Sequence, residues 1–532
     1  MLYSRYFIPT IKNTFAESEA RNYQILARGG FVRKAESGQY VVLPVGKRYF
    51  DRIFDYMKEP LVRKSGIETG RYEPETLMKA ILGDLNSYKI LPQIFYSRYT
   101  KNFDRRPRYG LAESSRSEMM GGILLGTRGF VDACVGLDEA LLQRLMMLGL
   151  KAGMASRSSI NMLQISDQTI YVKDENGSYE FFECKECGMA FDRETAIPRG
   201  LYPSCELREK SKGILRMVKT PGVSTINELV KFFSANSSEF VKTMIYVIDE
   251  KPVAALIRGD REISIQKLSR AMSTDKIRLA TEKEVIQITG ADIGFAGPVG
   301  LEITIVADHE IMEMSSFITG ANDTDYHFAN VTPCRDFQPE ITADIRCANV
   351  EDVCHCGGRF GEEKGFLVGT VEYIGSGWFE KNGHFYTDDE GKKMALEGAL
   401  CSIDITAIGG LLAEACDNGK NPIFLQEIAP FDCVIIIANI KDDVQLDLAL
   451  KISGELKKVG LEPLIDDRDE RIGIKFNDAE ALGVPIRIVC GKRSNEGIVE
   501  VMEASSGTLE MSYEASIQML SSLEESSVGF EF

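Results

Sequence analysis

Apolar residues in the middle of the chain show helical spacing in one segment and form continuous runs in the two segments after it. The amphipathic segment Ile226–Ser234 predicts a helix, and the apolar runs Met244–Ile248 and Val253–Ile257 that follow it predict buried strands. The first third of the chain mixes helical periodicity with short β-rich runs such as Gln39–Leu43. Residues from about 218 to 337 therefore form a self-contained α/β pattern inside a chain of mixed texture.

The last hundred residues show a second alternation of strands and helices. Cys433–Ala438 and Ile486–Val489 are apolar strands, and Val444–Val459 has the spacing of a helix. This order predicts a small sheet with covering helices. The most apolar stretch, Cys433–Ile440, is far shorter than the ~20 residues that cross a bilayer, so we expect no membrane partner.

Composition places the chain among globular proteins. Its 532 residues suggest about three to four domains at the usual ~100–200 residues each, and 44% of them are hydrophobic. The net charge of −17 argues against DNA or anionic membranes as partners held by bulk charge. Any nucleic-acid contact must come from clustered Arg and Lys.

Cysteine usage indicates a cytoplasmic protein. The amino terminus, MLYSRYFIPT, has no basic segment followed by a long apolar run, so it does not predict a signal peptide. Twelve cysteines in such a chain suggest reduced thiols, with metal binding as the first special use to consider.

Several segments, in order over nearly the whole chain, resemble bacterial prolyl-tRNA synthetases. They are Gly30–Gly38 with Leu43–Gly46, Ser87–Pro92, Arg106–Leu111, Val218–Gly222 through Arg335–Phe337, Ala429–Asp432, and Asp466–Lys475 running on to Gly483–Ile488. The resemblance implies an α/β (α+β) fold in three parts. A class II antiparallel-sheet core would span 1–217 and 338–428, an inserted editing domain 218–337, and an anticodon-binding domain 429–532.

The resemblance weakens where the family activates its amino acid. Class II synthetases place one Arg of their second motif on the α-phosphate of ATP and one Arg of their third motif on the γ-phosphate, because fixed cations stabilise the charge that develops there. The second motif of this chain, Lys101–Arg106, is one residue short and lacks the Arg-x-Glu pattern, although Arg106 and Arg108 remain in the Arg-Pro-Arg element. In the third motif Thr406 stands where the family has Arg.

Other parts of the ligation site are also altered. The family's Thr-His-Glu-Glu element reads Tyr72-Glu-Pro-Glu75, so Glu75 alone matches, and most of the first motif is missing between about Lys64 and Gly70. These losses predict that proline adenylation is lost. The alternative is that Arg105 or Arg116 takes over a phosphate contact.

The editing segment keeps the residue types that the resemblance assigns to hydrolysis of alanine wrongly attached to proline tRNA. They are Lys242, Asp308, Gly320, Asn322 and His327. Each residue also has an ordinary structural explanation: a solvated Lys, an Asp308 that caps a helix beginning near His309, and a buried structural His. Their common order and spacing favour the functional interpretation, and glycine permits close approach of backbone to a small substrate.

Two cysteine pairs flank this segment. Cys184 and Cys187 form one pair, and Cys354 and Cys356 form the other, with His355 between the latter two. Brought together, four thiolates would suit a structural tetrahedral zinc, with no open position for substrate. The alternative is a relic knuckle with free thiols.

The segment Asp466–Lys475 supplies candidate contacts to the anticodon stem-loop. The resemblance implies Arg468, Arg471 and Lys475 as cationic contacts, with Asp467 among the carboxylates that orient them or accept hydrogen bonds from bases. The alternative is a solvated, salt-bridged turn.

Three functions follow from these patterns. The first is a tRNA-binding deacylase of mischarged proline tRNA that needs no cofactor and no longer adenylates proline. The second is a non-catalytic pseudo-synthetase that senses tRNA or regulates a protein partner. The third is a proline–tRNA ligase with an atypical site, which would need ATP and Mg²⁺. Proline tRNA is the expected partner in each case, and a homodimer is a further possibility.

Overall fold

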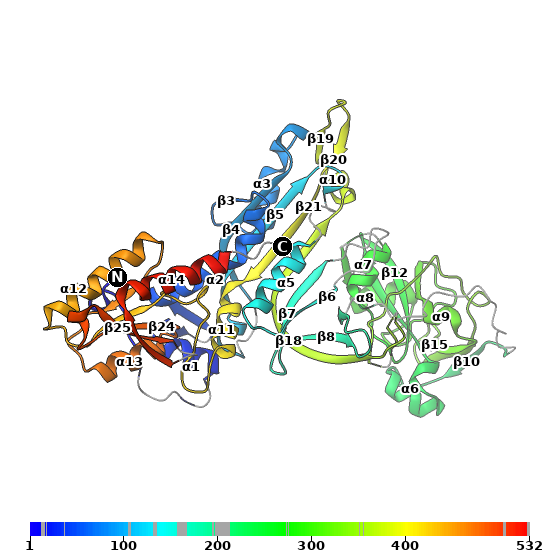
Figure 1. Ribbon diagram of the computed structural model, residues 1–532. Coiled ribbons are helices and arrows are strands. Elements are labelled where there is room, and N and C mark those ends of the chain that lie inside the picture. Colours follow the sequence, from blue (N-terminus) through cyan, green and yellow to red (C-terminus); the bar gives the residue numbers. More distant parts are fainter. Residues whose placement is uncertain are drawn as a thin grey trace. The chain divides into compact units, whose positions relative to one another are not determined.

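The computed structural model describes the chain except residues 12–15, 17–18, 37, 105–107, 131–135, 157–166, 194–195, 197–212, 273, 275, 351, 355, 504–506 and 529–532, and except the side chains of 523–528. Its contacts divide the chain into two compact units (Figure 1). Unit 1 comprises Met1–Met154, Asp167–Tyr179 and Lys364–Phe532, and unit 2 comprises Ala155–Ser166 and Glu180–Glu363.

An antiparallel sheet forms the core of unit 1, extended at one edge by a short parallel strand. The first six strands in its order are β3 (Ile67–Glu68), β4 (Gln93–Asn102), β5 (Arg116–Gly126), β21 (Glu397–Asp404), β18 (Phe360–Ile374) and β7 (Gln168–Lys173). Strand alternation directs Met120 and Leu124 of β5 into the core that helices α2 (Pro44–Arg63) and α11 (Ile405–Ala415) cover. Ile123 and Leu125 point to the opposite face, where they pack with α3 (Pro74–Ile81).

The end of the chain folds into a second sheet within unit 1. The strand order is β23 (Leu464–Asp466), β22 (Val434–Ile437), β24 (Ile486–Cys490), β25 (Ile498–Glu503) and β26 (Gly507–Ser512). Helices α12 (Asp443–Lys458), α13 (Ile472–Ala481) and α14 (Tyr513–Val528) accompany it. All four residues of β22 are buried because the strand is central and covered on both faces. The predicted small sheet with covering helices is confirmed.

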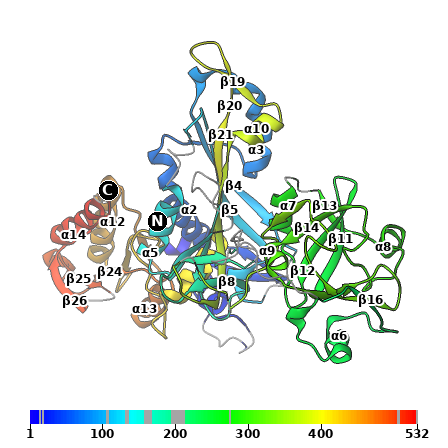
Figure 2. The same ribbon diagram turned by 90° about the vertical axis from the view of Figure 1, so that its right-hand side faces the viewer.

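Unit 2, drawn mainly in green in Figure 1 and Figure 2, includes two complete sheets among its described residues. One has the order β13 (Ile277–Leu279), β11 (Val241–Ile248), β12 (Lys251–Arg258), β14 (Thr304–Asp308) and β17 (Ile341–Ala343), and the other has the order β10 (Arg216–Lys219), β16 (Tyr326–Val331) and β15 (Phe317–Gly320). The helices are α6 (Ile226–Phe233), α7 (Ile265–Met272), α8 (Glu282–Thr289) and α9 (His309–Glu313). The helix expected at Ile226–Ser234 and the two strands after it are confirmed.

Hydrogen bonds between side chains and backbone amides explain where α6 begins. The side chain of Thr225 accepts a hydrogen bond from the Glu228 amide, and the Glu228 carboxylate accepts one in return from the Thr225 amide. This capping box satisfies amide groups that the first helical turn leaves without carbonyl partners. The helix contributes Ile226 and Leu229 to the lining of the unit 2 cavity described below.

The remaining elements complete the two units. They are α1 (Arg21–Arg28), β1 (Val32–Glu36), β2 (Gln39–Val42), α5 (Leu137–Met147), β6 (Ala152–Ser156), β8 (Tyr179–Cys184), β9 (Ala190–Asp192), α10 (Ser376–Lys381), β19 (Phe385–Thr387) and β20 (Lys393–Ala395). No helix in the described part of the chain is both long and apolar enough to cross a membrane.

Candidate functional site

Unit 2 contains a cavity of about 290 Å³. Its wall is mainly apolar and comes from the first half of β11, from α6, from the ends of β15 and β16, and from the loop before β14. The lining residues include Ile226, Leu229, Phe240, Lys242, Ile293, Ala296, Ile318, Thr319, Gly320 and His327. Three of the five residues predicted for hydrolysis therefore share one cavity: Lys242, Gly320 and His327.

His327 lies on β16, directly opposite Gly320 of β15 in the antiparallel register. Its ring is 1% exposed, and its Nδ1 lies 2.7 Å from the hydroxyl oxygen of Thr220. Its Nε2 has no hydrogen-bond partner among the described residues. Burial lowers the pKa of His327 to about 4, although the nearby backbone of Gly294 raises it, so the ring is neutral near pH 7.

Lys242 comes from the second position of β11. Its ammonium donates a hydrogen bond to the carbonyl oxygen of Arg261. Burial lowers the pKa of Lys242, while the nearby carboxylates of Glu262 and Asp260 oppose that shift. The side chain is thus a partly buried cation in the cavity wall, held at its tip by backbone.

Close backbone packing shapes the wall around Gly320. A β-carbon on Gly320 would lie 2.2 Å from the carbonyl oxygen of Phe295, which leaves no room for any side chain. Asn322, which has a φ of 55°, fixes the same loop, because its side-chain oxygen accepts from the Gly297 amide and its nitrogen donates to the carbonyls of Gly297 and Val299. Asn322 is not among the lining residues, so its contacts support the wall from behind.

Asp308 is separate from the cavity lining. It is fully buried at the end of β14, where its carboxylate accepts from the amides of Glu310 at 3.0 Å and Ile345 at 2.9 Å. Burial raises the pKa of Asp308 despite these two donors. The expectation that Asp308 caps a helix beginning near His309 is confirmed, since α9 begins at His309.

The sequence did not indicate two residues that contribute to the site. Thr220 belongs to the segment Val218–Gly222, which resembled the family without suggesting a role for that hydroxyl. Thr319 donates from its hydroxyl to the Val241 carbonyl at 2.9 Å and so ties β15 to β11 beside the cavity. Neither Thr stands out in a sequence, because the partner in each case is far away along the chain.

The four predicted cysteines meet in unit 2. The sulfur atoms of Cys184, Cys187, Cys354 and Cys356 all lie within 4.8 Å of one another. Cys184 and Cys356 are 3.4 Å apart, and Cys187 and Cys354 are 3.9 Å apart. A zinc ion bonded to four sulfurs at about 2.3 Å in a tetrahedron would separate them by about 3.8 Å. The donor set and its spacing therefore fit structural zinc.

The backbone around these thiols has the form of a metal knuckle. The Gly188 amide donates to the Cys184 carbonyl, and the Gly358 amide donates to the Cys356 sulfur at 3.4 Å. A β-carbon on Gly358 would lie 2.7 Å from the Cys184 sulfur, so glycine is required there. The backbone amide of Cys187 is the main cause that lowers the pKa of Cys184 to about 7. His355, named above with this pair, lies outside the described residues.

Comparison with known proteins shows which domains the chain combines. The profile of the aminoacyl-tRNA editing domain matches residues 220–337, and that of the anticodon-binding domain matches residues 432–523. A curated relative from Caldicellulosiruptor saccharolyticus, named proline–tRNA ligase, is 31% identical over 98% of this chain and 98% of its own. The chain belongs to the prolyl-tRNA synthetase family. A proline–tRNA ligase from Desulforamulus reducens is 32% identical over 96% of this chain and 97% of its own.

The family assignment confirms the expected fold. The chain has the mixed α/β class II fold of prolyl-tRNA synthetases, with an inserted editing domain and an anticodon-binding domain near its end. Contacts extend the compact unit that holds the editing domain to Glu180–Glu363, which is wider than the expected 218–337. The wider unit includes all four cysteines.

The residues predicted from the resemblance for the ligation site lie on the unit 1 sheet and beside it where the structure describes them. Thr406 is the second residue of α11, is 8% exposed, and accepts a hydrogen bond at its hydroxyl from the Glu118 amide at 2.8 Å. Glu75 is exposed in the first turn of α3. Arg108 and Arg116 are exposed, whereas Arg105 and Arg106 lie outside the described residues. The predicted loss of adenylation stays a prediction.

The candidate anticodon contacts surround the start of α13. Arg471 is exposed at the amino-terminal cap of that helix. Arg468 pairs with the carboxylates of Asp466 and Asp478 and lies 3.6 Å from the ring centre of Tyr3. The Asp467 carboxylate accepts from the Ser4 amide and hydroxyl. These contacts hold Arg468 and Asp467 in fixed positions at the surface of the domain.

Lys475 differs from its neighbours because it is buried, with 1% exposure. Its ammonium donates to the carbonyls of Ile437 at 2.7 Å and Asp466 at 3.3 Å. This geometry gives Lys475 a role in joining α13 to strands β22 and β23. A contact between Lys475 and tRNA remains a prediction.

Proposed function

We propose that this member of the prolyl-tRNA synthetase family hydrolyses the aminoacyl ester of mischarged proline tRNA at the unit 2 cavity. The observation that carries the proposal is the buried, unpartnered Nε2 of His327 in a cavity wall that also presents Lys242 and Gly320. A buried polar atom without a partner is costly in a folded protein, so its persistence favours a ligand that completes it.

The reaction adds water across an ester. The water oxygen attacks the carbonyl carbon, the bond to the terminal ribose oxygen breaks, and the ribose oxygen takes up a proton. His327 would orient the water or the ribose through Nε2, since Nδ1 already has Thr220 as its partner. Lys242 would place positive charge near a tRNA phosphate or near the developing oxyanion.

The cavity supports a small uncharged amino acid as the group removed. Its lining is mainly apolar, so a charged side chain would lose its hydration there without compensation. Tight packing between Gly320 and Phe295 limits the room on one side. Alanine fits both conditions, in agreement with the resemblance of the segment.

Other parts of the chain would serve this activity without a cofactor in the chemical step. The anticodon-binding domain would hold proline tRNA, with Arg468, Arg471 and Asp467 as contacts. Zinc at the four cysteines would be structural, and ATP with Mg²⁺ would be needed for ligation alone. We propose a cytoplasmic location, where proline tRNA is found, and association as a homodimer or with another protein stays a prediction.

Purified chain mixed with alanyl-tRNA for proline tests the proposal. We expect release of alanine by the wild type, and a rate about 10²-fold lower for His327→Ala, the usual loss when one positioned polar group of a catalytic site is removed. His384→Ala is the matched control, because His384 lies in unit 1 against Trp378. Equal rates for wild type and His327→Ala would rule out this role of the cavity.

Proline–tRNA ligation is the second candidate, and the comparisons favour it over a loss of ligation. The relatives named proline–tRNA ligase match at 31–32% identity over nearly the full length of both chains. Thr406 at the start of α11, where the family has Arg, is the observation that argues against ligation. Proline-dependent exchange of pyrophosphate into ATP decides between them: exchange above the no-proline background establishes ligation, and its absence supports a deacylase that does not charge tRNA.

A further inference from the structure

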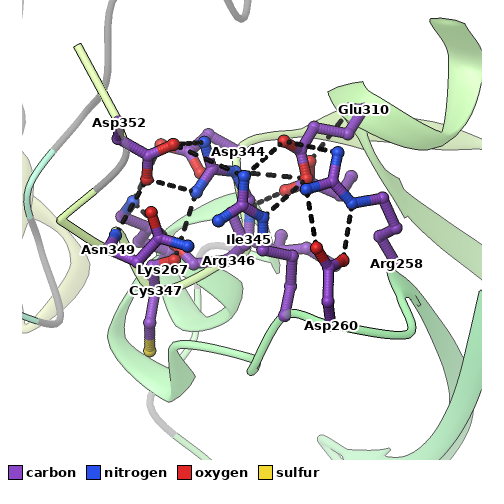
Figure 3. Close-up of polar contacts among 12 residues, drawn as sticks. Arg258, Asp260, Lys267, Glu310, Asp344, Ile345, Arg346, Cys347, Asn349 and Asp352 are labelled. Carbon is purple, nitrogen blue, oxygen red and sulfur yellow. Dashed lines mark hydrogen bonds and ion pairs between the residues drawn. The ribbon is translucent and has the colours of Figure 1, made fainter. Parts of the chain in front are cut away.

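A largely buried ionic network lies at the carboxyl ends of the parallel strands β12, β14 and β17 (Figure 3). The residues end these strands, lie in the segments after them, or come from the neighbouring helices α7 and α9. Its cations are Arg258, Arg261, Lys267 and Arg346, and its anions are Asp260, Asp308, Glu310, Asp344 and Asp352. The cluster is distinct from the cavity, since none of these nine residues lines it.

Arg346 is the centre of the network. Its guanidinium is 1% exposed and donates to both oxygens of Asp352, at 2.7 and 2.9 Å. Its Nε lies 3.5 Å from the Glu310 carboxylate. A buried guanidinium needs such partners because it has lost its hydration. The positions of Asp352 and Glu310 are therefore mutually dependent.

One end of the network reaches the four-cysteine site. Asp352 precedes Cys354 by two residues, and its carboxylate also accepts from the Asn349 amide at 2.8 Å. The Phe360 amide, beyond the last cysteine, donates to the Asp352 carbonyl at 3.4 Å. Asp352 thus belongs to the same short loop that presents Cys354 and Cys356.

The other end reaches the cavity wall. The guanidinium of Arg261 donates to Glu310 at 3.1 and 3.2 Å and to Asp352 at 3.5 Å. The backbone carbonyl of the same Arg261 accepts the hydrogen bond from the Lys242 ammonium. A continuous chain of contacts therefore runs from the cysteine loop through Asp352 and Arg261 to Lys242.

We infer that Asp352, Arg346 and Arg261 are positioning residues through which the four-cysteine site sets the place of the Lys242 ammonium in the cavity wall. Zinc bound to the thiols would fix the loop that carries Asp352, which would hold Arg261 and its carbonyl against Lys242. Loss of the metal, or of the Asp352 charge, would release that carbonyl. The consequence for deacylation rests on the proposed function, whereas the coupling between cysteines and Lys242 does not.

Chemical reactivity of Lys242 tests the coupling independently of catalysis. The full-length chain is treated with an acetylating N-hydroxysuccinimide ester, and acetylation of Lys242 is followed by mass spectrometry relative to Lys231, an exposed lysine of α6. The states compared are zinc-loaded and chelator-stripped wild type, Asp352→Asn, and Arg346→Lys. Glu180→Gln is the matched control, because it removes an exposed ion pair with Arg193 in the same unit.

We expect Lys242 to react several-fold faster in stripped wild type and in Asp352→Asn than in zinc-loaded wild type, with Glu180→Gln unchanged. Arg346→Lys should fall between, since it keeps the charge and loses the paired contacts. Equal Lys242 reactivity in loaded and stripped wild type would overturn the inference, even if Asp352→Asn failed to fold.

Deacylation measured on the same samples separates the two proposals. If zinc-loaded wild type deacylates, removal of the zinc should lower kcat and leave KM nearly unchanged. The reason is that substrate contacts remain while Lys242 is displaced. If no sample deacylates but Lys242 reactivity still follows the metal, the coupling stands and the proposed function fails.

Discussion

The hydroxyl of Thr220 lies 2.7 Å from Nδ1 of His327, and the opposite nitrogen of that ring has no partner among the described residues. Thr220 follows β10 and His327 lies on the neighbouring strand β16, so a hydrogen bond across the sheet edge fixes the rotation of the ring. The pKa of about 4 keeps the ring neutral, with Nδ1 next to Thr220 and with the backbone of Gly294 near the ring. This is the arrangement that a group orienting water or ribose requires.

Removal of the Thr220 hydroxyl should slow deacylation. Thr220→Val keeps the side-chain shape, and loss of one orienting hydrogen bond worth ~1–1.5 kcal/mol predicts a rate about tenfold lower. Single-turnover hydrolysis of alanyl-tRNA measures it. In a His327→Ala background the same substitution should have no further effect, and an additive effect there would show that Thr220 acts elsewhere.

Acid should destabilise unit 2 through His327. The folded pKa of about 4 lies below the ordinary value of 6.5, so between these values the unfolded chain binds a proton that the folded chain does not. Stability from this group is complete above about pH 6.5 and is lost as pH falls toward 4, by roughly 3 kcal/mol at most. Urea unfolding of wild type and His327→Gln at pH 7 and pH 5 measures it. The variant should lose less stability, and parallel losses would contradict the assigned environment.

Metal binding should depend on the cysteine cluster and on no other exposed thiol of unit 2. Cys356→Ser removes one of four ligands and should abolish zinc retention and lower the melting temperature of unit 2, since a structural metal contributes to folding directly. Metal analysis after gel filtration and a thermal melt measure the two effects. Cys334→Ser is the control, because Cys334 is exposed and lies outside the cluster. Equal zinc content in both variants would mean that the cluster is not the metal site.

Arg471 should contribute to tRNA affinity through charge. It is exposed at the start of α13, so Arg471→Ala should weaken binding of proline tRNA and reduce by about one the slope of log affinity against log salt. Filter binding at several salt concentrations measures both quantities. An unchanged slope would remove Arg471 from the interface.

Lys475 should behave differently because its ammonium is buried between two backbone carbonyls. Lys475→Met should lower the free energy of unfolding of the anticodon-binding domain by about 1–3 kcal/mol, since it leaves buried acceptors unpaired. Denaturant unfolding measures this. If Lys475→Met kept full stability and lost tRNA binding alone, the direct contact predicted from the sequence would be the better account.

Local patterns were sufficient to predict many elements. The amphipathic run of α6, and the alternating runs of β22, α12 and β24, carry their own signals of period. The cap formed by Asp308 was also among the expectations, because the residue stands directly before a helical segment.

The composition of the site depended on contacts that no local pattern reveals. Asp308 was grouped with Lys242 and His327, yet β14 places its carboxylate on the amides of Glu310 and Ile345. Arg346 looks like an ordinary solvated cation in the sequence and is fully buried in the structure. Asp352 is near in sequence, but Glu310 comes from a distant segment that becomes a neighbour only when the parallel strands assemble.

We propose that the unit 2 cavity removes a wrong amino acid from proline tRNA. The most direct measurement is the lifetime of alanyl-tRNA and of prolyl-tRNA, each with the same catalytic amount of the wild-type chain. We predict that the alanyl ester disappears over many turnovers while the prolyl ester lasts as long as in buffer. An alanyl ester that survives equally well with and without the chain would contradict the account.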